Sequence, residues 1–220
     1  MRALVLAVAL AATPAAAVEF VQTSGRLSDQ DFYRLITCAA PPGGDCADGI
    51  VRWPDRTVRD LRLVLEPIHP DYPKARAKEM LAALDRAIAE INAAGANLHL
   101  RRAPTGHGAP LRIYLTPAGD GEAIYGTGVD GVDDEIIGAG LTTVWWNDNR
   151  EITNGLIVMA GDLPSPEIYP VMLEELTQSL GFLTDIRNPV YEQESVFSED
   201  SNNVTRLGPQ DLMVLRRHYP

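Results

Sequence analysis

The chain has 220 residues, of which 45% are hydrophobic and 22% are charged, and its formal net charge at pH 7 is −11. This length and apolar content suffice for one domain with a substantial core. The acidic balance argues against a nucleic-acid partner, because such partners need clustered Lys and Arg to displace the counterions of phosphates. We interpret the acidity as favouring solubility.

The first residues have the three parts of a secretory signal. A basic start, Met1-Arg2, is followed by an apolar run from Ala3 to Ala12 and by the small residues Ala15 to Ala17. The run is too short for a membrane anchor, which needs about 20 apolar residues. We therefore predict a signal peptide over residues 1–17, no membrane span, and a periplasmic or secreted mature protein.

Residues 18–56 are predicted to form an N-terminal extension with a short helix over 28–35. Cys38 and Cys46, the two cysteines of the chain, bracket a Pro- and Gly-rich loop. In an oxidising compartment such a close pair predicts a disulfide. The spacing fits neither a redox Cys-x-x-Cys motif nor a zinc knuckle.

Residues 57–220 are predicted to be one α+β domain containing a mixed, twisted sheet of about four or five strands. Alternating apolar residues predict half-buried strands. Apolar residues three or four positions apart predict a long helix, a second helix that Ser165 caps, and a C-terminal helix. The acidic, Gly-rich stretch 118–140 lacks the spacing of a calcium loop and is predicted to be solvated. The predicted strands are 58–65, 97–102, 111–116, 141–146 and 155–160, and the helices are 74–94, 165–180 and 209–219.

The second helix carries the sequence Glu-Glu-Leu-Thr-Gln-Ser-Leu-Gly over residues 174–181. Glu174 and Gln178 are four residues apart and project from one helical face. In zincin metalloproteases two His ligands occupy such positions, the next residue is a water-activating Glu, and a Gly follows the second ligand. Glu175 and Gly181 stand where this motif has its Glu and Gly.

The end of the chain extends the resemblance. Ser195-Val196-Phe197 follows a short loop, and a terminal helix with Asp211 closes on Tyr219. This resembles the matrixin-like metzincins, in which a Ser-Ile-Met turn underlies the metal. The chain is also similar to a family of secreted bacterial proteins described as a zincin-like domain of unknown function. The resemblance implies a zincin-like fold in which a long backing helix and the 171–180 helix lie on the same face of the sheet.

The ligand positions depart from the motif. Glu174 and Gln178 replace two His residues, Thr184 stands at the third ligand position with Asp185 beside it, and Phe197 replaces the Met of the turn. Carboxylate, amide and hydroxyl groups make a poor zinc site, so we expect no zinc and at most weak calcium or magnesium binding. The remaining histidines show no ligand spacing and are expected to be surface or hydrogen-bonded residues: His69, His99, His107 and His218.

We expect a non-catalytic, pseudo-peptidase scaffold that binds a peptide or an envelope protein. In zincins the strand near the active-site helix pairs with substrate, and strand 141–146 is its counterpart here. Trp145 and Trp146 project to opposite faces, so one is expected in the core and the other in the groove. Without a metal, Glu175 is expected to accept a hydrogen bond near Ser195.

Two alternatives remain at this point. One is a metal-dependent hydrolase with Glu175 as general base and a hard cation held by Glu174, Gln178 and Asp185. The other is a structural envelope protein.

Overall fold

The computed structural model describes residues 19–104 and 107–220. The predicted signal peptide lies outside these residues. In the described part of the chain, no helix combines the length and the apolar character needed to span a membrane.

The centre of the structure is a five-stranded sheet in the order β3-β2-β4-β6-β5. Four strands are parallel and β5 runs antiparallel to β6 at one edge. The predicted α+β class and mixed sheet are therefore confirmed. The strands are β2 (Leu61–Leu65), β3 (Leu100–Arg102), β4 (Leu111–Leu115), β5 (Gly140–Trp146) and β6 (Ile152–Met159).

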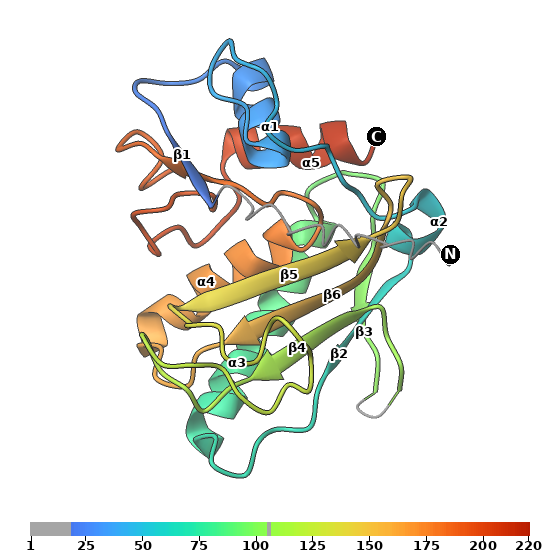
Figure 1. Cartoon of the computed structure of the whole chain (residues 1–220), viewed down its shortest axis with the longest axis vertical. Coiled ribbons are helices and arrows are strands. Elements are labelled where there is room, and N and C mark those ends of the chain that lie inside the picture. Colours follow the sequence, from blue (N-terminus) through green and yellow to red (C-terminus); the bar gives the residue numbers. More distant parts are fainter. Residues whose placement is uncertain (1–18, 105–106) are drawn as a thin grey trace, which may run out of the picture.

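Two helices, α3 (Lys74–Asn92) and α4 (Ser165–Gln178), pack together on one face of the sheet (Figure 1). The predicted apolar stripe of α3 is buried at Met80, Leu84 and Ile91. Since these residues are four and seven positions apart, which is about one and two helical turns, they form one face against the core.

The start of α4 differs from the prediction. Ser165 is the first helical residue and Pro164 the N-cap, so Ser165 does not cap the helix. The Ser165 hydroxyl instead donates to the Glu79 carboxylate of α3 at 2.8 Å. Pro170 lies inside the helix without ending it.

The opposite face of the sheet is exposed at Arg62 but covered toward the ends of β2 and β4, so the prediction of half-buried strands is correct only in part. Val64 and Tyr114, on the face that was expected to be open, are buried. The stretch 118–140 is not a solvated loop, because Ile124, Val132 and Ile137 are buried within it. The Tyr114 hydroxyl donates to the Tyr125 carbonyl of this loop at 3.1 Å. Its acidic residues, which suggested solvation, lie mostly on the outside.

A second layer of short elements gathers above β5 in Figure 1. It contains β1 (Phe20–Gln22), α1 (Asp29–Cys38), β7 (Asp185–Arg187) and α5 (Pro209–His218), and a short helix, α2 (Asp55–Val58), precedes β2. Strands β1 and β7 pair in parallel, and α1 packs on α5. The N-terminal extension is thus packed against the C-terminal segment.

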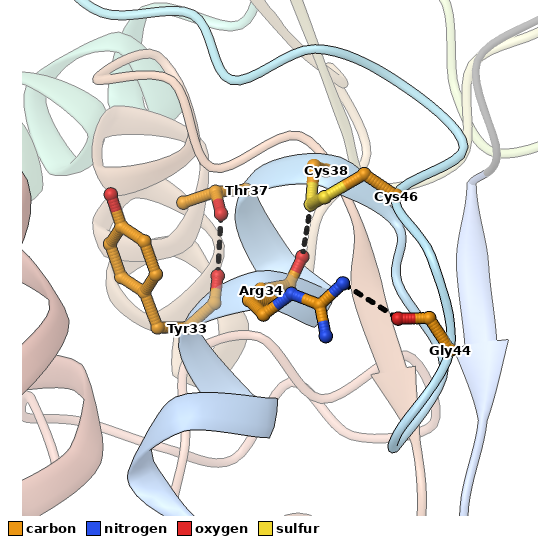
Figure 2. Close-up of a disulfide and its surroundings, with 6 residues drawn as sticks. All are labelled: Tyr33, Arg34, Thr37, Cys38, Gly44 and Cys46. Atoms are coloured by element: carbon orange, nitrogen blue, oxygen red, sulfur yellow. Dashed lines mark hydrogen bonds between the residues drawn. A yellow bond between two sulfur atoms is a disulfide. The ribbon is translucent and has the colours of Figure 1, made fainter.

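The predicted disulfide between Cys38 and Cys46 is confirmed, with Cα atoms 5.1 Å apart. Cys38 is the last residue of α1, which Ser28 caps by accepting from the Asp31 amide at 3.1 Å. Figure 2 shows the Arg34 guanidinium donating to the Gly44 carbonyl inside the loop, at 2.6 Å. The covalent bond and this hydrogen bond hold the loop against α1.

Candidate functional site

Glu174, Gln178 and Asp185 meet at the C-terminal end of α4. The Gln178 amide nitrogen donates to both Asp185 carboxylate oxygens, at 2.9 and 3.1 Å. Glu174, one turn earlier on the same helical face, interacts electrostatically with Asp185. The hydrogen bonds of Gln178 therefore go to Asp185, while Thr184 is buried just before β7. We call Glu174, Glu175, Gln178 and Asp185 the acidic face.

Glu175 is buried and points toward the start of β5. Its carboxylate accepts from the Thr142 hydroxyl at 2.7 Å. A Cβ on Gly140 would overlap this carboxyl group, with its carbon only 2.7 Å away, so the absence of a side chain at residue 140 makes room for it. The expected hydrogen bond near Ser195 was therefore wrong, because the helix turns Glu175 to the sheet rather than to the C-terminal loop.

Burial decides the electrostatics of the acidic face. Loss of solvent raises the pKa of Glu175 to about 7, against the opposing effect of the Thr142 hydrogen bond. Burial, together with the neighbouring carboxylates, raises the pKa of Asp185 to about 8 and that of Glu174 well above its ordinary value. The acidic face therefore carries less negative charge at neutral pH than its three carboxyl groups would in water.

The donor set does not fit zinc. Two carboxyl groups and a neutral amide replace the imidazoles, and the amide nitrogen already faces Asp185. Among residues 19–104 and 107–220, no group of three or more His, Cys, Asp or Glu side chains is arranged to hold a metal ion. His218, which lies beside Gly181, is buried and hydrogen-bonded to the Val51 carbonyl at 3.1 Å.

Beneath the acidic face, the Ser195–Phe197 turn is fixed by a buried carboxylate. Asp211 accepts from the Ser195 hydroxyl at 2.7 Å, the Val196 amide at 3.1 Å and the Gly208 amide at 2.8 Å. Burial raises the pKa of Asp211 to about 6, although these three donors favour its ionised form. Phe197 is buried, with its ring centroid 5.6 Å from that of Phe182.

Gly181 ends the α4 region with a φ of +105°. A Cβ at this position would overlap the Val51 carbonyl oxygen and lie 3.2 Å from the His218 ring. Both the backbone conformation and the close approach require glycine. The sequence motif placed Gly181 correctly as a turn but could not identify Val51 as the segment packed on it.

Trp53 and Tyr219 complete this support and were not predicted as site residues. The Trp53 indole donates to the Ser179 carbonyl at 2.9 Å, and the Tyr219 hydroxyl donates to the Leu180 carbonyl at 2.6 Å. Each satisfies a carbonyl just past the end of α4, where helical partners are missing. The signal in the sequence was weak, because it consisted only of two large aromatics near opposite ends of the domain.

The acidic face adjoins β5, one of the two edge strands of the sheet. In the described part of the chain, no other strand pairs with its outer edge. The register shifts between Trp145 and Trp146. Trp145 packs against the core, whereas Trp146 is 46% exposed at the end of the strand.

Comparison with known proteins gives little beyond the family. No curated protein matches the chain. Among solved structures 69 chains match, one of them entitled "Structure of a chaperone-substrate complex", with 14% identity and a TM-score of 0.40. That match covers 73% of this chain but only 33% of the other, and its low TM-score assigns neither a fold nor a partner. Residues 42–220 match the family described as "Protein of unknown function (DUF2927)", and the chain therefore belongs to that family.

Proposed function

We propose that this protein is an exported, zincin-like pseudo-peptidase that binds an extended peptide or protein segment along β5. The observation that carries the proposal is the outer edge of β5, which pairs with no strand among the described residues and lies beside the acidic face on α4. A free strand edge offers unpaired backbone N–H and C=O groups to an added strand.

The two edge strands of the sheet, β3 and β5, differ in length and in charge. Strand β3 is three residues long and contains Arg101 and Arg102, both of which form surface ion pairs. Short length and charge are common devices that prevent edge pairing. Strand β5 has seven residues, none of them charged. The sheet thus protects one edge and leaves the other able to pair.

The zincin resemblance is supported by several local agreements. Helices α3 and α4 share a face of the sheet, Glu175 follows the first ligand-equivalent position, and Gly181 turns the chain after α4. The Ser195–Phe197 turn is buried near the end of that helix. These features fit a scaffold kept for its groove after its ligands changed.

The chemistry of the acidic face favours binding over hydrolysis. A zincin Glu acts on a metal-polarised water, and the Glu174–Gln178 pair lacks the imidazole nitrogens that zinc prefers. An ordinary carboxylate does not generate hydroxide at neutral pH. Glu175 instead anchors the start of β5 through Thr142.

Export is proposed from the signal-like start of the chain. The Cys38–Cys46 disulfide agrees with an oxidising compartment such as the periplasm or the extracellular space. Cell fractionation with N-terminal sequencing of the mature protein tests this, and a mature chain beginning near Val18 is the expected result.

The binding proposal is tested with a displayed library of random heptapeptides. Hydrogen exchange is then measured on the purified protein with and without a selected peptide. We expect slower exchange in residues 140–146 and no change in 100–102, the matched edge. The same peptide with alternate backbone nitrogens methylated should lose the effect. Enrichment of no peptide, or protection only away from β5, would refute strand addition.

A hydrolase with atypical ligands is the second candidate. It is favoured by one observation, the meeting of Gln178 with Asp185 beside Glu174. Magnesium- or calcium-dependent cleavage of a peptide library, abolished by Glu175→Gln, would support it against the binding proposal.

A further inference from the structure

The surface at the two ends of β5 has opposite charge. A cleft of about 440 Å³ lies at the start of the strand and another of about 690 Å³ lies beyond its end. Each cleft is lined in part by residues close to β5 in sequence, Gly138 and Ala139 in the first and 149–151 in the second. Their charges therefore bear on any segment that pairs with the strand.

The first cleft is acidic. It is lined by Gly138 and Ala139, which precede β5, and by the carboxylates of Asp120, Asp162 and Glu167. No Lys, Arg or His is among its lining residues. The Asp162 carboxylate accepts from the Asp120 amide at 3.2 Å, which holds two sides of the cleft together.

The second cleft is the positive one. It is lined by Asn149, Arg150 and Glu151, which follow the strand, and by Arg52 and Arg56 around α2. Arg52 is paired with Asp55, another lining residue. The Glu151 carboxylate accepts from Asn147 at 3.1 Å. In the described residues neither Arg56 nor Arg150 forms a salt bridge, and both residues are exposed.

In a chain of net charge −11, a cleft with an excess of guanidinium groups is a departure from the background. The strand between the clefts is uncharged, and its seven residues span about 20 Å at the usual rise of a strand. Figure 1 shows the tail of β5 near the start of α4 and its head near α2. The two clefts are thus separated by the length of the edge.

We propose that the segment added to β5 carries opposite charges at its two ends, about seven residues apart. A Lys or Arg side chain enters the acidic cleft, and a carboxylate meets Arg56 and Arg150. The carboxylate belongs either to Asp or Glu or to the C-terminus of the partner chain. The centre of the segment is uncharged and has strand-forming residues that match β5. This inference rests on the proposed strand addition.

The test uses capped nonapeptides with a Thr-Val centre. One has Lys before and Glu after the centre, one has the reverse order, and one has Ser at both ends. The two charged orders correspond to parallel and antiparallel pairing with β5, so one of them should bind preferentially. Because exposed ion pairs contribute modestly to binding free energy, we expect a dissociation constant about tenfold lower for one charged order than for the Ser peptide. The measurement is fluorescence anisotropy at low salt, where surface charges are least screened.

Charge-reversal variants test whether the two clefts cause the preference for one peptide order. Arg56→Glu with Arg150→Glu, or Asp120→Lys with Glu167→Lys, should remove the advantage of the preferred order. All four substitutions together should make the opposite order the better one. Arg59→Glu and Glu135→Lys are the matched controls, because both residues are exposed and neither lines a cleft. A free C-terminal carboxylate on the Ser peptide shows whether a chain end replaces the acidic side chain.

The outcomes separate this inference from the proposed function. Equal binding of all three peptides, with hydrogen-exchange protection of residues 140–146, would overturn the charge pattern and leave strand addition standing. Failure of every peptide to protect residues 140–146 would overturn both. If the variant with all four substitutions prefers the opposite peptide order, the charge pattern is established.

Discussion

The acidic face and the turn beneath it are neighbours in the fold but differ in how their polar groups are satisfied. In the turn, Asp211 receives three hydrogen bonds from Ser195, Val196 and Gly208. On the acidic face, Glu174 and Asp185 are half-buried, and loss of solvent together with the Asp185 carboxylate raises the pKa of Glu174. The comparison teaches that a fully hydrogen-bonded buried carboxylate can lie beside carboxyl groups that burial drives toward their neutral form.

The largest effect is expected in the turn. Asp211→Ala would leave the buried Ser195 hydroxyl, the buried Val196 amide and the partly buried Gly208 amide without their acceptor. Unsatisfied buried donors cost about 1–3 kcal/mol each, so we expect a loss of at least about 3 kcal/mol in the free energy of unfolding. Urea denaturation measures it. Asp148→Ala, at an exposed position, is the control. A loss below about 1 kcal/mol would mean that the turn is not held by this carboxylate.

The second prediction concerns the pH dependence of stability, which Glu175 on the acidic face should influence. The folded pKa of Glu175 is about 7, above its ordinary 4.5, so between these values the folded state binds more protons than the unfolded state. Stability is therefore lost as pH rises through this range. Glu175→Gln removes the effect, and its stability relative to wild type should improve by up to about 3 kcal/mol from pH 4.5 to 8.

A histidine opposes this trend at lower pH. Burial lowers the pKa of His218 to about 4, so its contribution to stability rises with pH until about 6.5. The difference between the Glu175→Gln variant and wild type cancels this common contribution. Thermal unfolding at several pH values, with Glu135→Gln as an exposed control, measures the difference. A pH-independent difference would show that Glu175 titrates normally.

A smaller effect is expected at the junction of the acidic face and β5. Gly140→Ala would bring a Cβ against the Glu175 carboxyl group, and overpacking of this kind costs about 1–3 kcal/mol. Gly138→Ala is the matched control, because a Cβ there meets nothing within 4 Å. The cost of Gly140→Ala should fall when Glu175 is also replaced by Ala. An equal cost in both backgrounds would show that contact with the Glu175 carboxyl group does not cause the destabilisation.

These residues also show which features the sequence could reveal. The α3 stripe, the five strands of the sheet and the Cys38–Cys46 bond follow local patterns, and the structure bears them out. The pairing of β1 with β7 was missed because each strand has three residues and its partner lies far along the chain. Spacing placed Glu174 and Gln178 on one helical face. It could not show that Thr142 would bind Glu175, since that contact depends on how α4 crosses β5.

The central claim is that a zincin-like scaffold here has lost its zinc ligands, and zinc stoichiometry tests it most directly. Three proteins are dialysed against zinc and then against buffer: wild type, the double variant Glu174→His/Gln178→His, and the double variant with Asp185→Ala added. Bound metal is then measured by elemental analysis. Asp185 is the natural third ligand for the double variant, because its carboxylate already contacts residue 178. Adding Thr184→His to the double variant supplies the motif's own third position.

We expect no stoichiometric zinc in wild type, about one zinc per chain in the double or triple histidine variant, and loss of zinc from the double variant on Asp185→Ala. Near-stoichiometric zinc in wild type that is lost on Glu174→Ala would contradict the account and restore the metal-dependent hydrolase. Folded histidine variants that bind no zinc would contradict the zincin-like geometry itself.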